Sequence, residues 1–344
     1  MASIDVFHSD PFTMIELTSA VERNPFLPTG IGELGLFTDN PIRTRALAVE
    51  QRKGQLTLIP TSPRGAPATE RTTEKRAARY FEVPRLRHGD TIYADEIQSV
   101  RAFGQETEVM QLQTEVARRL AGPTGLQSNM EFTFEHMRLA AIQGLLIDAD
   151  GSTLFDWFAE FGITAATEIA FDLNHASPVD GALRIQCNKV VRTMARASQG
   201  AFTTQTVVMG MCGDDFWDAL VTHPDVTKTY YNWAAAQELR QGTAFEAMRF
   251  GGIDWFNYRG SDDTTTIGIA HDKVKFFPRN ANGVFLRALA PAENFTFANT
   301  LGREMYVQPI FDRDRNEWWR MEVTSYPLFI CTRPEVLMTG RQGT

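Results

Sequence analysis

Cysteine is scarce in this chain of 344 residues, and its three copies form no recognisable site. Cys187, Cys212 and Cys331 are odd in number and far apart in the sequence. This distribution excludes a disulfide framework and a CxxC zinc or redox motif, and it fits a reducing compartment. Lysine is also rare, with six copies among 34 basic residues.

Long apolar runs are missing as well. The first residues, MASIDVFHSDPF, contain neither a basic region nor an apolar stretch of the kind found in secretory signals. The most apolar segment, near Leu139–Ala149, is interrupted by Gln143 and Asp148, whereas a membrane helix needs about 18 apolar residues. The sequence therefore predicts no secretory signal and no contact with a membrane.

Motifs for catalysis or for binding metals and cofactors are incomplete. The six histidines are dispersed without HExxH spacing. Gly30–Gly35 matches GxGxxG but follows two prolines instead of a strand, so a turn in an extended arm is favoured over a dinucleotide site. Asp148–Gly151 lacks the EF-hand register and indicates a helix-to-strand turn. We predict no catalytic residue, no cofactor and no metal site.

One enzymatic alternative stays open at this point. His271 could form a nucleophilic pair with a cysteine such as Cys212 or Cys331, which would make the protein a hydrolase. No GxSxG elbow or cysteine signature surrounds these residues. The sequence therefore favours a protein without catalysis.

Charge is unevenly distributed. The net charge is −8, but residues 43–88 contain eleven basic and four acidic residues, a local charge of +7 that leaves −15 for the remainder. A basic segment can bind nucleic acid. Arginine can instead form bidentate pairs with acids of an adjoining subunit, and the acidic remainder favours this interpretation. The candidate inter-subunit contacts are Arg64, Arg71, Arg76 and Arg79.

The order of predicted elements is unusual for a compact enzyme. An extended arm to about residue 40 precedes two strand-like segments, Gln55–Ile59 and Tyr80–Val83, separated by a polar stretch rich in proline and glycine. We predict a two-stranded arm, which is marginal in water unless it lies on a neighbour. A helix broken at Gly122–Gly125 follows, spanning Gln105–Ile147 over about 65 Å at 1.5 Å per residue.

The pattern after this helix is α+β. Ser128 is the predicted N-cap of the helix's second half, whose inner face comprises Met130, Phe134, Met137, Ala141 and Leu145. Asp180 is the predicted cap of a helix with Leu183, Cys187, Val190 and Met194 inward. Strands are predicted at Ser152–Phe158, Glu168–Leu173 and Gln205–Met211, a helix at Asp214–Thr222, and a closing hairpin of Met305–Asp312 with Glu317–Cys331.

Several segments carry a family resemblance. They are NPFLPTGIGELGLF, RHGDTIYADEIQSVRAFG, LIDADGSTLFDWFAEFGI, CGDDFWDALVTHPDV, FPRNANGVFLRALAP and SYPLFICTRPEVLM, which together extend from about residue 24 to 338. In order and spacing the sequence resembles the tailed-phage major capsid proteins of the lambda major head protein (capsid protein E) family, which have the HK97-like fold.

The resemblance implies a division of the chain. It places an N-arm at 1–43, an extended loop at 44–94, a spine helix with the peripheral domain at 95–164, an axial domain at 165–300 and a terminal hairpin at 301–344. The implied function is structural: the protein would self-assemble through hexamers and pentamers into the icosahedral head of a tailed double-stranded DNA bacteriophage.

The resemblance also implies partners. They are other copies of the chain, a portal, a separate scaffold protein, a maturation protease, a decoration protein and packaged DNA held non-specifically on the inner face. The implied location is the virion, assembled in the bacterial host cytoplasm. Some relatives cross-link subunits through a Lys–Asn bond, but only Lys53 and Lys75 lie in the loop region here. We predict no such cross-link.

Overall fold

The computed structural model describes residues 26–52, 76–99, 116–231, 247–261, 267–315 and 317–343. Its helices are α2 (Gly30–Glu33), α3 (Ala94–Ser99), α5 (Leu126–Ile142), α6 (Trp157–Phe161), α7 (Ala182–Ala197), α8 (Asp214–Thr222), α9 (Pro224–Tyr231) and the 3₁₀ helix η3 (Pro334–Val336). Its strands in the first half are β1 (Thr38–Pro41), β2 (Ala46–Arg52), β3 (Arg76–Glu82), β4 (Leu86–Tyr93), β5 (Leu145–Ile147), β6 (Thr153–Asp156) and β7 (Ile169–Ala170). Its strands in the second half are β8 (Val207–Cys212), β9 (Ala247–Phe250), β10 (Ile253–Asn257), β11 (Lys273–Arg279), β12 (Phe285–Leu289), β13 (Tyr306–Phe311), β14 (Trp318–Ser325), β15 (Pro327–Cys331) and β16 (Met338–Arg341).

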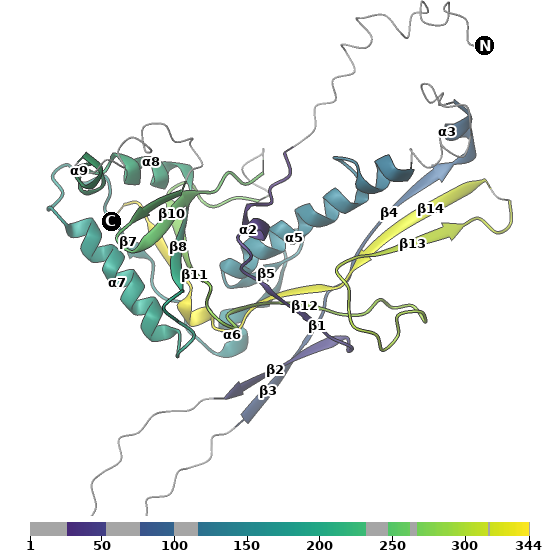
Figure 1. Cartoon of the computed structure of the whole chain (residues 1–344), viewed down its shortest axis with the longest axis horizontal. Helices are drawn as coiled ribbons and strands as arrows, with labels where there is room; N and C mark the ends of the chain where they lie inside the picture. The colour runs from purple at the N-terminus through teal and green to yellow at the C-terminus, as the bar shows by residue number, and fades with distance from the viewer. Residues whose placement is uncertain are drawn as a thin grey trace, which may run out of the picture.

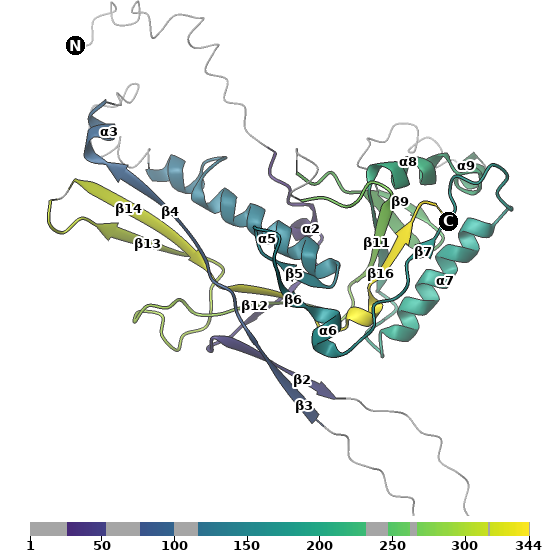
Figure 2. The same ribbon diagram turned by 180° about the vertical axis from the view of Figure 1, so that it is seen from behind.

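The molecule is elongated and has three parts (Figure 1). A six-stranded sheet with α7, α8 and α9 forms one end, while α5 and the sheet of β4, β13 and β14 form the other. The β2–β3 ribbon leaves the body between them, as the opposite view also shows (Figure 2). Helices and sheets are segregated along the chain, which confirms the predicted α+β class.

The six-stranded sheet has the order β7-β16-β11-β8-β10-β9. Its strand β8 is apolar on both sides because both faces are covered. Val208 and Cys212 join the core under the helices, whereas Met209 and Met211 join the core that continues toward α5. Helix α8 has the predicted bounds, and the predicted inner face of α7 is buried in full.

The break in the long helix is confirmed, but its end is not. A helical segment at 116–121 is separated by residues 122–125 from α5, and residues 105–115 lie outside the described part. Helix α5 ends at Ile142 instead of Ile147, because Gly144 takes a φ of +83° and β5 begins directly after it. The N-cap is Gly125, while the Ser128 hydroxyl donates to the carbonyl of Gly122.

Three turn and strand predictions are also corrected. Asp148–Gly151 joins β5 to β6 as a hairpin turn, not a helix to a strand. The predicted strand Ser152–Phe158 ends early, because the Asp156 carboxylate caps α6. The predicted closing strand Glu317–Cys331 is two strands in two sheets: β14 lies between β13 and β4, and β15 pairs with β12.

Candidate assembly surfaces

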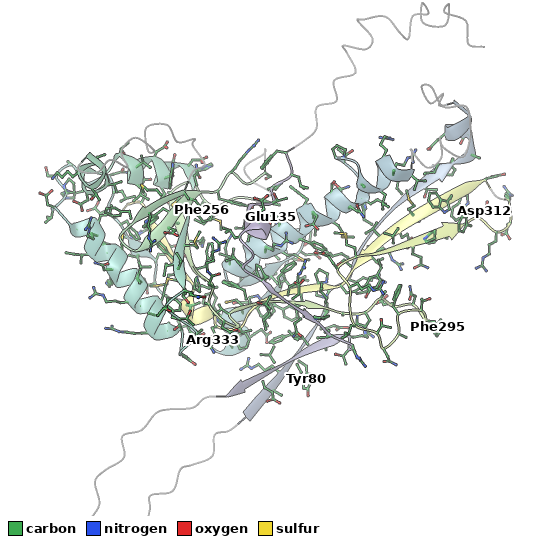
Figure 3. All side chains as sticks on the ribbon, in the orientation of Figure 1. Tyr80, Glu135, Phe256, Phe295, Asp312 and Arg333 are labelled. Carbon is green, nitrogen blue, oxygen red and sulfur yellow. The ribbon has the colours of Figure 1, made fainter. Side chains whose placement is uncertain are left out.

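The β2–β3 ribbon is the most extended surface of the molecule. Its strands pair antiparallel from Ala46 with Glu82 to Arg52 with Arg76, and neither pairs with another strand of the described chain. A two-stranded ribbon is present as predicted, but the partner of the strand that contains Tyr80 is Ala46–Arg52, whereas the predicted first strand, Gln55–Ile59, lies outside the described residues. Tyr80 points away from the body with 74% of its surface exposed (Figure 3).

The root of the ribbon is fixed by an aromatic cluster. Phe81 is 2% exposed, and its ring centroid lies 5.7 Å from Phe155, 5.3 Å from Trp157 and 6.0 Å from Phe161. Edge-to-face packing of this kind adds to the free energy of burial. Leu47 on the facing strand is also buried. The ribbon therefore has a rigid base from which it projects.

Of the four predicted contact arginines, Arg79 is the one whose side chain is described. Its guanidinium lies 5.7 Å from the ring centroid of Phe161 on its own chain. A cation above an aromatic face is held electrostatically by the ring quadrupole. Arg79 thus belongs to the root of the ribbon. Arg64 and Arg71 lie outside the described residues, as does the side chain of Arg76.

The glycine-rich segment does bind an anion, but one from its own chain. Residues Gly30–Glu33 form the helical turn α2, where the N–H groups of Ile31 and Gly32 donate to the Glu135 carboxylate over 2.6 and 3.1 Å. Glu135 is fully buried on α5 and also accepts from the Tyr258 hydroxyl at 3.1 Å. The prediction of an extended arm is therefore wrong for residues 26–42, which dock on the body.

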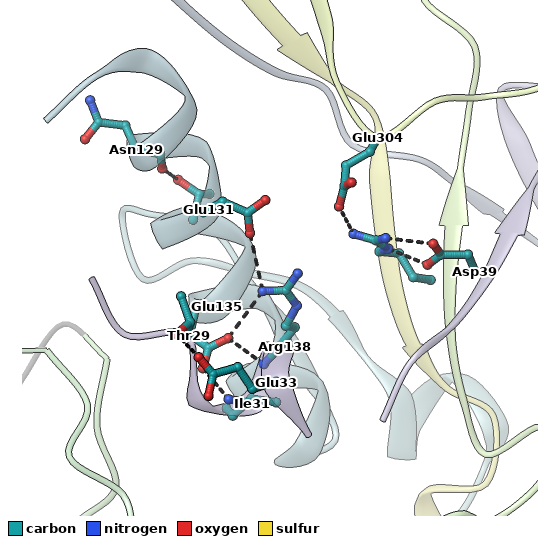
Figure 4. A network of polar contacts seen from close by, with 12 residues as sticks. Thr29, Ile31, Glu33, Asp39, Asn129, Glu131, Glu135, Arg138 and Glu304 are labelled. Atoms are coloured by element: carbon teal, nitrogen blue, oxygen red, sulfur yellow. Dashed lines mark hydrogen bonds and ion pairs between the residues drawn. The ribbon is translucent and has the colours of Figure 1, made fainter. Parts of the chain in front are cut away.

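A second charged cluster holds the same segment further along (Figure 4). Arg287 on β12 donates to both carboxylate oxygens of Asp39 on β1, over 2.6 and 2.8 Å, and also pairs with Glu304. Arg138 on α5 lies 3.3 Å from Glu135 and 3.7 Å from Glu131. Strand β1 pairs parallel to β12, with Asp39 opposite Arg287 in the register. The N-terminal segment is thus attached by a strand pairing, by backbone hydrogen bonds to Glu135 and by the Asp39–Arg287 ion pair.

Large exposed apolar side chains lie toward the periphery. Phe295, in the loop between β12 and β13, is fully exposed and points outward (Figure 3). Phe311 on β13 is 62% exposed, and Ile185 on α7 is 65% exposed. Because these residues lie on different parts of the molecule, they fit several separate contacts better than one ligand pocket.

The cysteines considered as nucleophiles lie in environments that oppose this role. Cys187, Cys212 and Cys331 are all buried. Burial raises the pKa of Cys187 and of Cys331 to about 12, and it also raises the pKa of Cys212. A thiol nucleophile reacts as the thiolate, so these environments oppose the hydrolase alternative. In the described part of the chain no three His, Cys, Asp or Glu side chains gather as a metal site, and no helix is long and apolar enough to cross a membrane.

Known proteins are similar to this chain in fold or in sequence. The solved capsid structure of cyanophage P-SCSP1u superimposes with a TM-score of 0.56 at 12% identity, covering 94% of this chain and 91% of that one. The major capsid protein of Salmonella phage Felix O1 is 26% identical, covering 96% of both chains. That of Pseudomonas phage KPP10 is 25% identical, covering 95% of this chain and 96% of that one.

The projecting ribbon, the long helix and the α+β body are those of the HK97-like fold, as the resemblance implied. Within that class, the model of the family described as phage major capsid protein E matches residues 13–342. The chain belongs to that family, and its role is structural: it forms the capsid shell.

Proposed function

We propose that copies of this chain assemble into the hexamers and pentamers of an icosahedral head enclosing double-stranded DNA. The β2–β3 ribbon carries the proposal. It exposes Tyr80, pairs with no third strand of the described chain, and has a rigid root at Phe81. A two-stranded ribbon is marginal in water by itself, so lying across a neighbouring copy would stabilise it and enlarge each contact.

The chain divides in this proposal as the resemblance implies. Residues 1–43 are the N-arm, 44–94 the extended loop, 95–164 the spine helix and peripheral domain, 165–300 the axial domain and 301–344 the terminal hairpin. The β2–β3 ribbon supports the second of these segments. The six-stranded sheet with its helices supports the fourth, to which the last segment adds strand β16. The docked residues 26–42 would attach the C-terminal part of the N-arm to the body.

Arg64, Arg71 and Arg76 are the proposed contacts between the ribbon and acids of a neighbouring copy. The net charge of −15 outside residues 43–88 supports this role, since acids are plentiful on the remainder of the chain. Arg79 differs from them because its side chain packs on Phe161 at the root. It would therefore orient the ribbon instead of contacting the neighbour.

The finer points of the role are part of the same proposal, which membership of a capsid family supports. The proposed partners besides the chain itself are a portal, a separate scaffold protein, a maturation protease, a decoration protein and the packaged DNA. The head would assemble in the cytoplasm of the bacterial host and persist in the virion. The subunit would act without catalysis, to which the buried cysteines lend support.

The test removes residues 53–75, which connect the two strands of the ribbon in the sequence, while keeping the body. Replacing residues 53–75 by Asn-Gly joins Arg52 to Arg76, which face each other in the ribbon, through a two-residue hairpin turn. We expect this variant to keep its far-UV circular dichroism per residue but to form no rings or shells. Sedimentation velocity and negative-stain microscopy, with and without the scaffold protein, measure the result.

Two arginine variants refine the test. R71E/R76E reverses the charge and should block assembly, whereas R71K/R76K keeps the charge and is the matched control. Shells from the shortened variant would contradict the role of the ribbon. If R71E/R76E instead abolished a steep, salt-dependent affinity for DNA and left assembly intact, the nucleic-acid interpretation of the basic segment would replace it.

A further inference from the structure

Helix α7 presents an unusually basic surface. Residues 181–213 contain four basic residues and no acid, although the chain as a whole has a charge of −8. All four basic residues are exposed: Arg184, Lys189, Arg192 and Arg196. At 3.6 residues per turn they occupy one side of the helix over about 18 Å of its length. The opposite side of α7 is buried in the core.

These cations have no acidic partner within the described chain. Arg184 donates to the Thr229 hydroxyl at 3.2 Å and lies 5.5 Å from the Phe250 ring centroid, while Arg192 donates to the carbonyl of Asn188. Ile185 lies among these basic side chains, and 65% of its surface is exposed. An apolar side chain ringed by charges is the arrangement of a protein–protein contact, whose centre is apolar and whose rim is polar.

Helix α8 presents the complementary surface. Asp214, Asp215 and Asp218 are exposed. Asp214 lies 3.5 Å from His271, but Asp215 and Asp218 have no basic partner within the described residues. The helix dipole favours acids in the first turn, which explains Asp214 and Asp215. Asp218 is beyond that turn, so the helix itself does not account for it.

The two surfaces lie where copies arranged around an axis could join. Helices α7 and α8 pack in the same core on one face of the six-stranded sheet. In Figure 1, α8 lies along the upper edge of this domain, α7 along its lower left edge, and α9 at the corner between them. A contact between two different edges of successive copies is heterologous, and repeating it generates a ring.

We propose that the basic face of α7 in one copy docks on the acidic face of α8 in the next copy. The proposal rests on the self-assembly proposed above and names one of its contacts. The Arg192 and Arg196 side chains would pair with Asp215 and Asp218 of the neighbour, and Ile185 would lose its exposure to water. Packaged DNA fits this surface less well, because Ile185 offers nothing to a phosphate and the α8 acids of the same domain repel one.

A charge swap tests the contact. R192E/R196E and D215K/D218K each place like charges in the interface, and we expect each to raise the concentration required for half-maximal assembly by at least about tenfold. The variant carrying all four changes restores opposite charges and should return to within about threefold of wild type. Light scattering and sedimentation velocity measure assembly, and far-UV circular dichroism checks the fold. R192Q/R196Q replaces the first variant if that variant is unfolded.

R313E/R315E is the matched control. It reverses two arginines at the turn between β13 and β14, at the far end of the molecule (Figure 1). Combining R313E/R315E with D215K/D218K should not restore assembly.

The contact would be overturned if the variant with all four changes, R192E/R196E/D215K/D218K, assembled no better than R192E/R196E or D215K/D218K alone. Normal assembly of R192E/R196E with loss of retained DNA would overturn it in favour of a surface facing DNA. Failure of the wild type to assemble would reject the proposed function itself.

Discussion

Two carboxylates, one in the N-terminal segment and one close to it, have pKa values shifted in opposite directions. The Arg287 side chain donates to Asp39 and holds the pKa of that carboxyl below its ordinary value. Partial burial on α5 raises the pKa of Glu131, although Arg138 lies 3.7 Å away. Asp39 thus stabilises the fold when charged, whereas Glu131 favours the protonated state.

The pH dependence of stability should separate these residues. The contribution of Asp39 is present above its unfolded pKa, about 3.9, and is lost as the pH falls through its lower folded value. D39N should therefore lose stability most at pH 6 and least at pH 3. For Glu131 the sign reverses: its contribution is present below its unfolded pKa of about 4.3 and is lost as the pH rises through the folded value. The free energy of unfolding of E131Q should therefore increase relative to that of the wild type as the pH rises.

Urea unfolding from pH 3 to 7, at one protein concentration, measures both differences. E131Q is the matched control for D39N, because it removes a nearby carboxylate with the opposite shift. If the free energies of unfolding of the two variants, relative to wild type, changed with pH in the same direction, the opposite pKa shifts of Asp39 and Glu131 would be contradicted.

Gly144 supplies a second prediction at this scale. Its φ is +83°, and a Cβ there would lie 2.2 Å from a ring atom of Phe158. Gly151 has the same φ, but a Cβ there meets nothing within 4 Å. G151A should cost about 1 kcal/mol from backbone strain, and G144A about 3 kcal/mol because the overlap adds to it. Equal shifts in urea midpoint for the two variants would show that the overlap is relieved at no cost.

At the scale of elements, the N-terminus of α7 is capped across the fold. The Asp225 carboxylate on α9 accepts from the N–H groups of Gly181 and Leu183, over 2.9 and 3.2 Å. The predicted cap, Asp180, is instead exposed and pairs with Lys228. The sequence prediction of this cap was therefore wrong, although the helix itself was predicted.

The two aspartates make a matched pair of variants. D225A leaves two backbone donors without their acceptor and should lower the free energy of unfolding by about 1–2 kcal/mol. D180A removes an exposed ion pair and should leave the melting temperature unchanged. Thermal unfolding of both variants measures the difference. A larger loss of stability for D180A than for D225A would show that Asp180 is the cap of α7.

Sequence periodicity predicted elements well where one element's own residues decide the outcome. The bounds of α8 and the inner face of α7 follow from helical spacing and apolar side chains. The failures arise where a distant residue decides. Asp225 is 42 residues from Leu183, and Glu135 is 104 residues from Ile31. A glycine-rich segment indicates a backbone able to bind an anion, but no local pattern reveals that the anion is the buried Glu135.

At the scale of the whole molecule, the scarcity of lysine predicts a non-covalent shell. Lys189, Lys228, Lys273 and Lys275 belong to the domain of the six-stranded sheet, and Lys53 and Lys75 fall in the ribbon segment outside the described residues. Mature particles boiled in SDS should therefore run as one band at the 38.7 kDa of the single chain. A ladder of multiples would contradict this and would point to Lys53 or Lys75.

The chain order of the strands bears on when a subunit becomes able to assemble. Strand β14 occupies the centre of one sheet, β15 completes a second sheet beside β12, and β16 lies between β7 and β11 in the third. The ribosome synthesises all three after every other strand of those sheets, and β13 immediately precedes β14. A nascent or prematurely terminated chain thus lacks inner strands in two of its sheets. Such a chain would be left to cellular proteases and chaperones, so translation itself would act as a quality check on the subunits available to the shell.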